Sequence, residues 1–545
     1  MSSFNQLYDT MSSKKLKLVF ALITILSLQI IVYAQKTNWG EVIKGAKGYE
    51  PQIIGEDSVF YYVYSCSQKE LIVEKHEKTS LKIAYSKKYD VVKNHKLEKA
   101  VLTGNKLLFF FSNYDKDKKK TQLYCNTYLS GDGTKAELMN VLFSADLENE
   151  ERSAGRENGI KAVFENENYN ILTTTDNKRI LIRHEQYSEK EEKHTRTYIL
   201  LATDLKKLVE KKEEISRDED KTFYTSGMTL DDAGSLYFFK NYFGTGNYKT
   251  SLICYDANKA YDSYEYQIDT TRLLIIPGRG ELSTSAITFD KAGNMIIVGE
   301  FIKHDLLAGY YFVKINTKTK QTIESKLNEL SENFINQFRT ARQIKKGKDA
   351  VIPRAFSKMK LIVKEDGGVI GTTDIYTRGE LTRRVKQGSF TINEHVGEYH
   401  IYKDIIAINL SADGTMLWAN RIPRNQMCKY KYVNTIGRDL VYFSHFVALS
   451  NNKLFIAYND TPANVAVLSD NKRLKRFKHP EGAVLALFTI DLKTGEKEKG
   501  QFLDGMDTEV KPEPKSAFQK SQNSDLIIIG SNGKKFKNGV MSFGK

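Results

Sequence analysis

Cysteine is rare in this 545-residue chain, and the four cysteines are far apart in the sequence. They form no Cys-x-x-Cys pair, so the motifs built on paired cysteines for zinc or redox chemistry are absent. Four cysteines permit three disulfide connectivities, but a chain of this size does not need disulfides to be stable. Pairing and burial as free thiols therefore both stay open for Cys66, Cys125, Cys254 and Cys428.

Recognisable catalytic and metal-binding motifs are missing as well. No Gly-x-Ser-x-Gly nucleophile elbow occurs in the sequence. His395, Glu398 and His400 have side chains that bind metals, and we expect them in a long loop between strands. Three ligands so close together would need a special backbone shape, and structural zinc normally takes four protein ligands. We therefore assign no catalytic residue, no metal ligand and no cofactor from the sequence.

Long apolar runs are limited to one, near the N-terminus. A basic patch at residues 14–17 precedes the uncharged run Leu18–Ile31, and Ala34 ends the segment with a small residue. This layout is typical of a secretory signal peptide, and the run is shorter than the ~20 apolar residues of a membrane-spanning helix. We expect residues 1–34 to be a signal peptide with an upstream extension, cleaved before Gln35. An uncleaved anchor is the alternative.

The composition of the remaining chain predicts a secreted or cell-envelope protein with a large core. Hydrophobic residues make up 41% of the chain and aromatic residues 11%, and no second long apolar run could span a membrane. The net charge of +15 favours contact with polyanions, and the export signal argues against nucleic acid. We expect a monomer whose partner is an unknown protein or an anionic polysaccharide. A lysine-rich solvated surface is the plainer alternative.

Internal repetition gives the strongest indication of the fold. Four segments share one pattern, in which an apolar strand end leads into a short Asp/Gly turn and then a β-rich strand. Asp and Gly tolerate the positive φ that tight hairpins require. The four segments are Leu230–Phe239, Phe289–Val298, Val363–Thr372 and Leu410–Trp418.

The repeated unit predicts a four-stranded antiparallel sheet, and a ring of such sheets is a β-propeller. Strand signals recur near residues 59, 107, 171, 236, 296, 369, 454 and 527. We therefore expect an all-β fold over residues 35–545, with one large propeller of eight four-stranded blades. Seven blades and two smaller propellers are the alternatives. The last unit is short, and we expect residues 37–43 to pair with the C-terminal blade at 515–545.

Helical periodicity occurs in one place. Leu327, Leu330, Phe334 and Phe338 recur at helical spacing, which predicts one short inserted helix near residues 325–345. The proline-containing segment Lys511–Lys515 is interpreted as a stiff connector before the final blade.

The sequence resembles uncharacterised secreted bacterial β-propeller repeat proteins. The stretches that carry the resemblance are Ile406–Gln426 and Leu454–Asn464. The resemblance implies export and a propeller fold, and it transfers no catalytic residue to this chain.

One basic cluster is a candidate binding site, in a long loop between the strands near Leu454 and Val484. The cluster could hold an anionic polymer or the acidic surface of another protein, and a solvated loop is the alternative. We interpret the chain as an exported, non-catalytic binding or scaffold propeller. The alternative is a propeller enzyme, a glycosidase or lyase acting on extracellular polysaccharide. The cluster consists of Lys472, Arg473, Lys475, Arg476 and Lys478, followed by His479.

Overall fold

The computed structural model describes the greater part of the chain. No helix in this part is long and apolar enough to cross a membrane. The expected signal peptide at residues 1–34 lies outside it. The described residues are 35–43, 49–115, 119–146, 169–188, 193–216, 223–242, 249–266, 285–303, 306–339, 343, 345–346, 352, 357, 359–387, 390–431, 442–464, 474–479, 482–498, 501–502, 509–519, 525–532 and 535–543.

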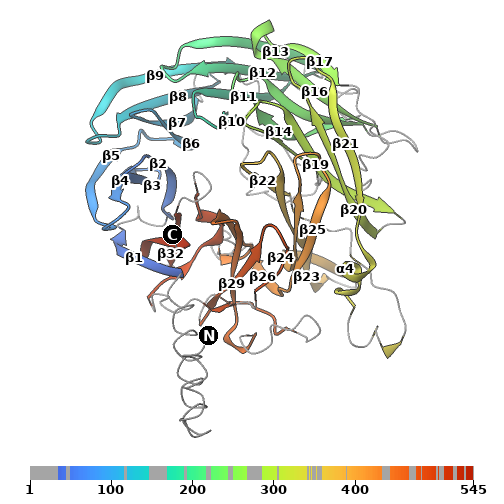
Figure 1. Ribbon diagram of the computed structural model, residues 1–545. Coiled ribbons are helices and arrows are strands. Elements are labelled where there is room, and N and C mark those ends of the chain that lie inside the picture. Colours follow the sequence, from blue (N-terminus) through green and yellow to red (C-terminus); the bar gives the residue numbers. More distant parts are fainter. Residues whose placement is uncertain are drawn as a thin grey trace, which may run out of the picture.

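The strands form eight antiparallel sheets that follow one another around a circle (Figure 1). This arrangement is a β-propeller, and it confirms the predicted all-β fold with eight blades. From the centre outwards, blade 1 contains β2 (Gln52–Glu56), β3 (Phe60–Cys66), β4 (Glu70–Glu77) and β5 (Ile83–Asp90), and blade 2 contains β6 (His95–Thr103), β7 (Lys106–Asp115), β8 (Lys120–Leu129) and β9 (Lys135–Asp146). Blade 3 contains β10 (Tyr169–Thr173), β11 (Arg179–Ser188), β12 (Lys193–Ala202) and β13 (Lys207–Ser216), and blade 4 contains β14 (Phe223–Leu230), β15 (Leu236–Tyr242), β16 (Lys249–Asp256) and β17 (Asp262–Tyr266).

Blades 5 to 8 complete the circle, and the last of them takes its outer strand from the N-terminus. Blade 5 contains β18 (Ala286–Phe289), β19 (Met295–Lys303), β20 (Leu306–Ile315) and β21 (Thr322–Glu329). Blade 6 contains β22 (Lys360–Val363), β23 (Val369–Gln387), β24 (Phe390–Leu410) and β25 (Met416–Ile422), with β26 (Gln426–Lys431) also paired to β24. Blade 7 contains β27 (Phe446–Ser450), β28 (Lys453–Asp460), β29 (Val484–Asp491) and β30 (Gln501–Phe502), and blade 8 contains β31 (Lys511–Pro512), β32 (Leu526–Ser531), β33 (Phe536–Phe543) and β1 (Gln35–Ile43).

The core lies between the faces of neighbouring blades. In blade 2, Leu107–Phe111 are consecutive buried residues of β7, because the second strand of a blade is covered on both faces. The outer strand β13 instead alternates between exposed and half-buried residues. Seven of the eight strand signals in the sequence fall at or next to the second strand of a blade, and the one near residue 171 falls on β10, a first strand.

The predicted Asp/Gly turns are present. Gly234 and Gly414 have φ values of 91° and 81°, in the left-handed region that favours glycine. The first turn joins β14 to β15 and the second joins β24 to β25. Asp231 Oδ1 accepts a hydrogen bond from the Ser235 backbone N–H at 2.8 Å, which closes the first of these turns.

The two ends of the described chain meet in blade 8. Strand β1, which contains the expected segment 37–43, pairs antiparallel with β33. Trp39 lies opposite Gly539, and a Cβ atom at Gly539 or Gly530 would crowd the Trp39 ring. The indole therefore packs directly on the backbone of the last blade.

A short helix lies within the expected interval 325–345, but the interval is not helical throughout. Its first part belongs to the outer strand β21, where Ile323 and Leu327 are 47% and 36% exposed. The α-helix α4 is short and covers only Glu332–Asn336. Leu330 and Phe334 are buried against blades 5 and 6. The sequence joined an outer strand and a short helix into one helical pattern.

Gln343 and Lys345 are also helical, and three short 3₁₀ turns occur among the described residues. These turns are η1 (Ala257–Lys259), η4 (Pro462–Asn464) and η5 (Pro514–Ser516). The segment Lys511–Lys515 is no connector, because Lys511 and Pro512 form β31, the innermost strand of blade 8. None of the four cysteines forms a disulfide, and three of them are buried.

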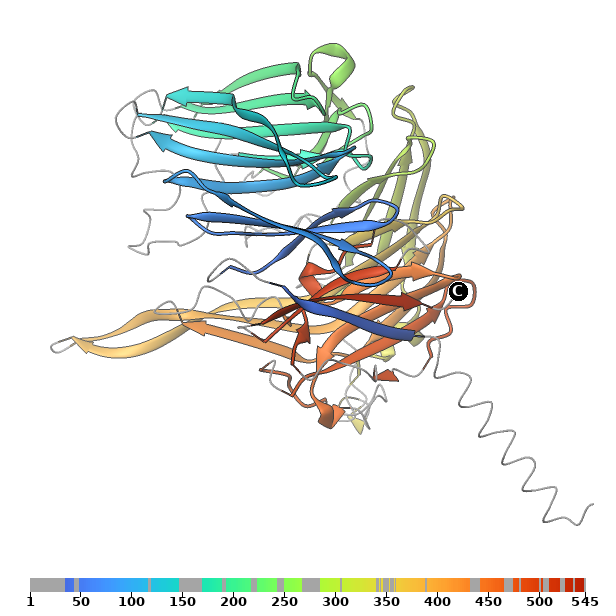
Figure 2. The same cartoon turned by 90° about the vertical axis from the view of Figure 1, so that its left-hand side faces the viewer.

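Blade 6 carries the longest strands among the described residues. Strands β23 and β24 have 19 and 21 residues, and they leave the ring together as a long hairpin (Figure 2). We call this hairpin the ribbon. Near its base, β26 pairs with residues 397–402 of β24 and widens the sheet. The candidate site lies along this edge.

Candidate functional site

The described part of the basic loop is the segment 474–479, and it lies against β26. Phe477 forms a parallel bridge with Gln426. The Met427 N–H donates to the Phe477 carbonyl and the Phe477 N–H donates to the Asn425 carbonyl, both at 2.9 Å. The segment thus adds a short extra strand to the base of the ribbon. Of the predicted binding residues, Lys472 and Arg473 lie outside the described residues.

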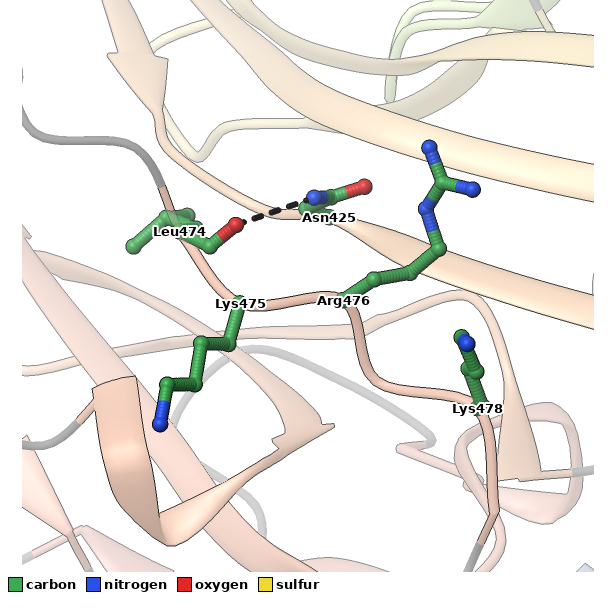
Figure 3. Close-up of a pocket in the computed structure, with 5 residues that line it drawn as sticks. All are labelled: Asn425, Leu474, Lys475, Arg476 and Lys478. Atoms are coloured by element: carbon green, nitrogen blue, oxygen red, sulfur yellow. Dashed lines mark hydrogen bonds between the residues drawn. The ribbon is translucent and has the colours of Figure 1, made fainter.

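The side chains of two asparagines also form hydrogen bonds with the backbone of this segment. The Lys475 N–H donates to Asn464 Oδ1 at 2.8 Å, and Asn464 Nδ2 donates to the Lys475 carbonyl at 2.9 Å. Asn425 Nδ2 donates to the Leu474 carbonyl at 3.1 Å (Figure 3). The segment is a loop, as the sequence predicted, and these hydrogen bonds hold its backbone against the base of the ribbon.

The side chain of Phe477 anchors the segment to the core. It is buried in a cluster with Tyr402, Cys428, Tyr442 and Phe443. Because successive side chains of an extended segment point to opposite faces, burial of Phe477 turns its two neighbours outwards. The neighbours are Arg476 and Lys478, and both are exposed.

Two surface hollows lie along this segment, with volumes of about 440 and 310 Å³. Arg476 and Lys478 line both of them, and the described residues that line the hollows include no Asp or Glu. We call the two hollows together the basic groove. The other lining residues are Asn425, Leu474 and Lys475 in the first hollow and Met427, Cys428, Lys429 and His479 in the second.

The cations of the groove are not neutralised by neighbouring acids in the part of the chain that the structure describes. No described carboxylate forms an ion pair with Lys475, Arg476 or Lys478. Arg476 Nη1 instead lies 3.1 Å from the thioether sulfur of Met427. In Figure 3, Lys475 and Arg476 leave the backbone in opposite directions. Among the described residues, the groove therefore presents positive charge without a paired carboxylate.

A buried ionic network lies beneath the groove and is one feature that the sequence did not reveal. The Arg424 guanidinium donates to the Asp374 carboxylate, and His445 Nδ1 lies 2.7 Å from Asp374 Oδ1. The Arg424 guanidinium also lies 5.6 and 5.8 Å from the ring centres of Tyr402 and Tyr458. Arg424 immediately precedes Asn425 and Gln426, so this network holds the start of β26 in place.

The protonation states in this network follow from its burial. Burial alone would raise the pKa of Asp374, but the Arg424 and His445 side chains hold it well below its usual range. Burial lowers the pKa of His445 to about 4, although the charge of Asp374 opposes that shift. At neutral pH the network is therefore an ionised Asp374, a charged Arg424 and a neutral His445.

The same residues have the connectivity of a hydroxyl–imidazole–carboxylate triad. His445 Nε2 lies 3.3 Å from Thr372 Oγ1, while its Nδ1 contacts Asp374. The exposed fractions of Thr372, His445 and Asp374 are 2%, 1% and 3%, which leaves no access for a substrate to the hydroxyl. The residues belong to β23 and to the segment before β27, and no spacing motif in the sequence links them. We assign them a structural role at the junction of blades 6 and 7.

The metal-ligand types considered in the sequence lie within β24, not in a loop as expected. Glu398 accepts two hydrogen bonds from Arg378, both at 2.7 Å. His400 Nδ1 lies 2.6 Å from the Tyr376 hydroxyl oxygen, and His395 Nε2 lies 2.8 Å from the Gly397 carbonyl oxygen. Glu398 and His400 share one face of the strand, with 3.6 Å between Glu398 Oε2 and His400 Nε2, but no group of three metal-binding side chains occurs among the described residues.

The chain is similar in structure to several solved propellers. An uncharacterised protein from Listeria monocytogenes is 10% identical with a TM-score of 0.35, over 91% of this chain and 96% of that one. The β-propeller domain of the Trilobed protease from Pyrococcus furiosus is 11% identical with a TM-score of 0.32, over 86% and 96%. The WD40 domain of SCAP from fission yeast is 7% identical with a TM-score of 0.31, over 93% and 98%.

No protein-family model matches the chain, and no curated protein matches it. The assignment of the fold therefore rests on the eight sheets themselves, and the assignment of a site rests on the geometry of the basic groove.

Proposed function

We propose that this protein is an exported, non-catalytic binding propeller that holds a polyanionic partner in the basic groove. The observation that carries the proposal is the position of Arg476 and Lys478. Both side chains line the two hollows, and both project from a backbone that β26 and Asn464 hold in place.

The fixed backbone matters for affinity. Ordering a loop on binding costs free energy, and a loop that is already ordered avoids most of that cost. Uncompensated cations also raise the local concentration of anions and speed their association. Both effects favour a binding role for the segment over that of a merely solvated loop.

The content of the groove favours binding over catalysis. Glycosidases need two carboxyl groups about 5–9.5 Å apart, beside the bond that breaks. The described residues that line the two hollows supply cations, an amide, a thiol and apolar groups, and none of them is a carboxylate. Asp374, Asp460 and Glu513 are acidic but fully buried. An assay for new reducing ends after incubation with polygalacturonate separates the enzyme alternative from the binding proposal.

Export is part of the proposal and has its own test. The basic, apolar and small-residue order of residues 14–34 supports a cleaved signal peptide. Mass spectrometry of the native protein should give a mature chain that begins at Gln35. A mass that retains residues 11–34 would contradict cleavage.

The binding proposal is tested with a charged and a neutral polymer of the same sugar. We expect dextran sulfate to bind and neutral dextran not to bind, with an affinity that falls as salt is added. The double variant Arg476→Gln/Lys478→Gln should weaken binding of dextran sulfate by about tenfold or more, which is about 1.4 kcal/mol.

A matched control separates the groove from general surface charge. Lys291 and Lys318 are exposed cations on turns of blade 5, so Lys291→Gln/Lys318→Gln removes the same charge elsewhere. We expect this control to keep the affinity within about twofold. Equal losses in the two double variants would contradict a specific groove.

A further inference from the structure

The register of the ribbon determines which side chains share its outward face. Tyr399 of β24 lies directly opposite Lys429 of β26, and Ile401 lies opposite Met427. The residues between them, including His400 and Cys428, are buried towards the ring. Because side chains of directly opposed residues point to the same face, Tyr399 and Lys429 are neighbours on the outward side.

The basic segment continues the same face. Phe477 and its bridge partner Gln426 are both buried, so they point inwards with Cys428. Arg476 and Lys478 therefore point outwards with Met427 and Lys429. The contact of Arg476 with the Met427 sulfur agrees with this placement. One surface thus runs from Tyr399 across Lys429 to Arg476 and Lys478.

Gly379 determines the orientation of the tyrosine. It lies opposite Tyr399 on the other side of β24, and a Cβ atom at Gly379 would collide with the Tyr399 ring. The ring therefore lies across the backbone of Gly379, where any other residue would place a side chain. Tyr399 itself is partly exposed, so the surface offers a flat aromatic ring to solvent beside the cations.

We propose that this surface is a subsite for an acidic polysaccharide, with one sugar ring stacked on Tyr399 and the anionic groups of the chain on Lys429, Arg476 and Lys478. This inference rests on the proposed polyanion binding in the basic groove. A sugar ring has an apolar C–H face and a polar rim. The face can cover an aromatic ring and remove apolar area from water, while carboxylate or sulfate groups on the rim reach the cations.

The dimensions fit an extended chain of sugars. Neighbouring strands lie about 4.8 Å apart, so the line from β24 across β26 to the basic segment spans about 10 Å. A chain of linked sugar rings can cover that span. A chain that runs across the strands can therefore place one ring on Tyr399 and its anionic groups over Arg476 and Lys478.

Other polyanions use this surface less fully. The acidic side chains of a protein would meet the cations but have no flat ring for Tyr399. Single-stranded nucleic acid stacks successive bases on several aromatic side chains, whereas the described residues of this face include one. A uronic acid polymer matches both halves of the surface.

The test compares three polyanions on two tyrosine variants. Tyr399→Ala should weaken binding of polygalacturonate by about tenfold, whereas Tyr399→Phe keeps the ring and should stay within about twofold of the native protein. Binding of polyglutamate should not change in either variant. Tyr49→Ala, at an exposed tyrosine in the segment before blade 1, is the matched control and should bind polygalacturonate normally. Thermal melts of all variants verify that the fold is intact.

The outcomes separate this inference from the function on which it rests. If Arg476→Gln/Lys478→Gln loses polygalacturonate while Tyr399→Ala does not, the basic groove stands and the sugar subsite is overturned. If Tyr399→Ala weakens binding of polyglutamate as strongly as binding of polygalacturonate, Tyr399 does not recognise the sugar ring, and the subsite is also overturned. Tighter, Tyr399-dependent binding of oligo(dT) would assign the surface to single-stranded nucleic acid instead. If no polyanion binds the native protein, both proposals fail.

Discussion

Asn538 and His76 lie 462 residues apart in the sequence, yet Asn538 Nδ2 is 3.0 Å from Nε2 and 3.1 Å from Nδ1 of His76. Both residues are buried, and the His76 ring stacks on Tyr61 at 5.1 Å between ring centres. The contact joins blade 8 to blade 1. Together with the pairing of β1 and β33, this contact closes the ring at one place, where single substitutions can test it.

Ring closure should depend on Trp39. Trp39→Ala removes an indole that packs on the backbone of Gly530 and Gly539, and we expect a loss of about 3–5 kcal/mol in the free energy of unfolding. Val42→Ala, at an exposed position of the same strand, should cost little and serves as the control. Urea denaturation measures both. Deletion of residues 35–43 should lower the melting temperature further and promote association through the open edge, and an unchanged melting temperature would contradict the closure.

The four cysteines should remain reduced. Burial raises the pKa of the Cys66 and Cys254 thiols to about 12, which leaves little reactive thiolate at neutral pH. We expect slow labelling by a thiol reagent in the native protein and four labelled thiols after unfolding, with or without a reductant. Fewer than four thiols in unfolded, unreduced protein would indicate a disulfide.

Glu513 should make the protein less stable at alkaline pH. Burial, with a further contribution from Glu50, raises the pKa of Glu513 from 4.5 to about 8. Because the folded-state pKa lies above the unfolded one, the stabilising contribution is complete below pH ~4.5 and is lost as the pH rises through about 8. Glu513→Gln should therefore stabilise the protein at pH 8 by about 1–3 kcal/mol and have little effect at pH 4. Melting temperatures across this range test the sign, and an equal effect at both pH values would contradict it.

The buried network under the groove should be required for folding. Asp374→Asn leaves the Arg424 charge buried without its partner, and we expect a loss of about 3–5 kcal/mol. The exposed pair Lys453–Glu498 provides the control, because Glu498→Gln should cost at most about 1 kcal/mol. Chemical denaturation compares the two variants. Similar small losses would show that the network does not hold the base of the ribbon.

His445 adds a second pH dependence, on the acid side. Burial lowers its pKa to about 4, below the ordinary value of 6.5. Its contribution to stability is therefore complete above pH ~6.5 and is lost as the pH falls towards 4. The free energy of unfolding should fall less between pH 7 and pH 5 in His445→Gln than in the native protein, as measured by urea denaturation. An identical fall in the variant would assign the acid loss to other groups.

The sequence was informative wherever a local pattern decided the structure. Asp/Gly turns and apolar runs act over a few residues, so they located strands such as β19 and β28 and the number of blades. The helical spacing of Leu327 and Phe334 made the predicted helix too long, because an outer strand and a short helix happen to continue one period. In β21 the blade supplies an edge for pairing, and that tertiary contact overrides local preference.

The candidate site was only half visible in the sequence, for a related reason. A cluster of cations is a local feature, and Lys475, Arg476 and Lys478 could be named from it. The partners that give the cluster its form come from elsewhere: Asn464 fixes its backbone, Gln426 pairs beside it, and Tyr399 shares its face. Only the strand register brings them together, and the sequence contains no spacing from which that register follows.

The pairing of β1 with β33 also joins strands that are made at different times during synthesis. Synthesis proceeds from the N-terminus, so β1 is made before the other strands of the ring and its partner β33 is made after them. Until then, neither β1 nor the edge of the last blade has its hydrogen-bonding partner. A prematurely terminated chain therefore keeps an unmatched strand at its beginning, and such exposed edges favour aggregation. The ring is complete only when both β1 and β33 are present, so a molecule that lacks either strand leaves an edge of blade 8 unpaired.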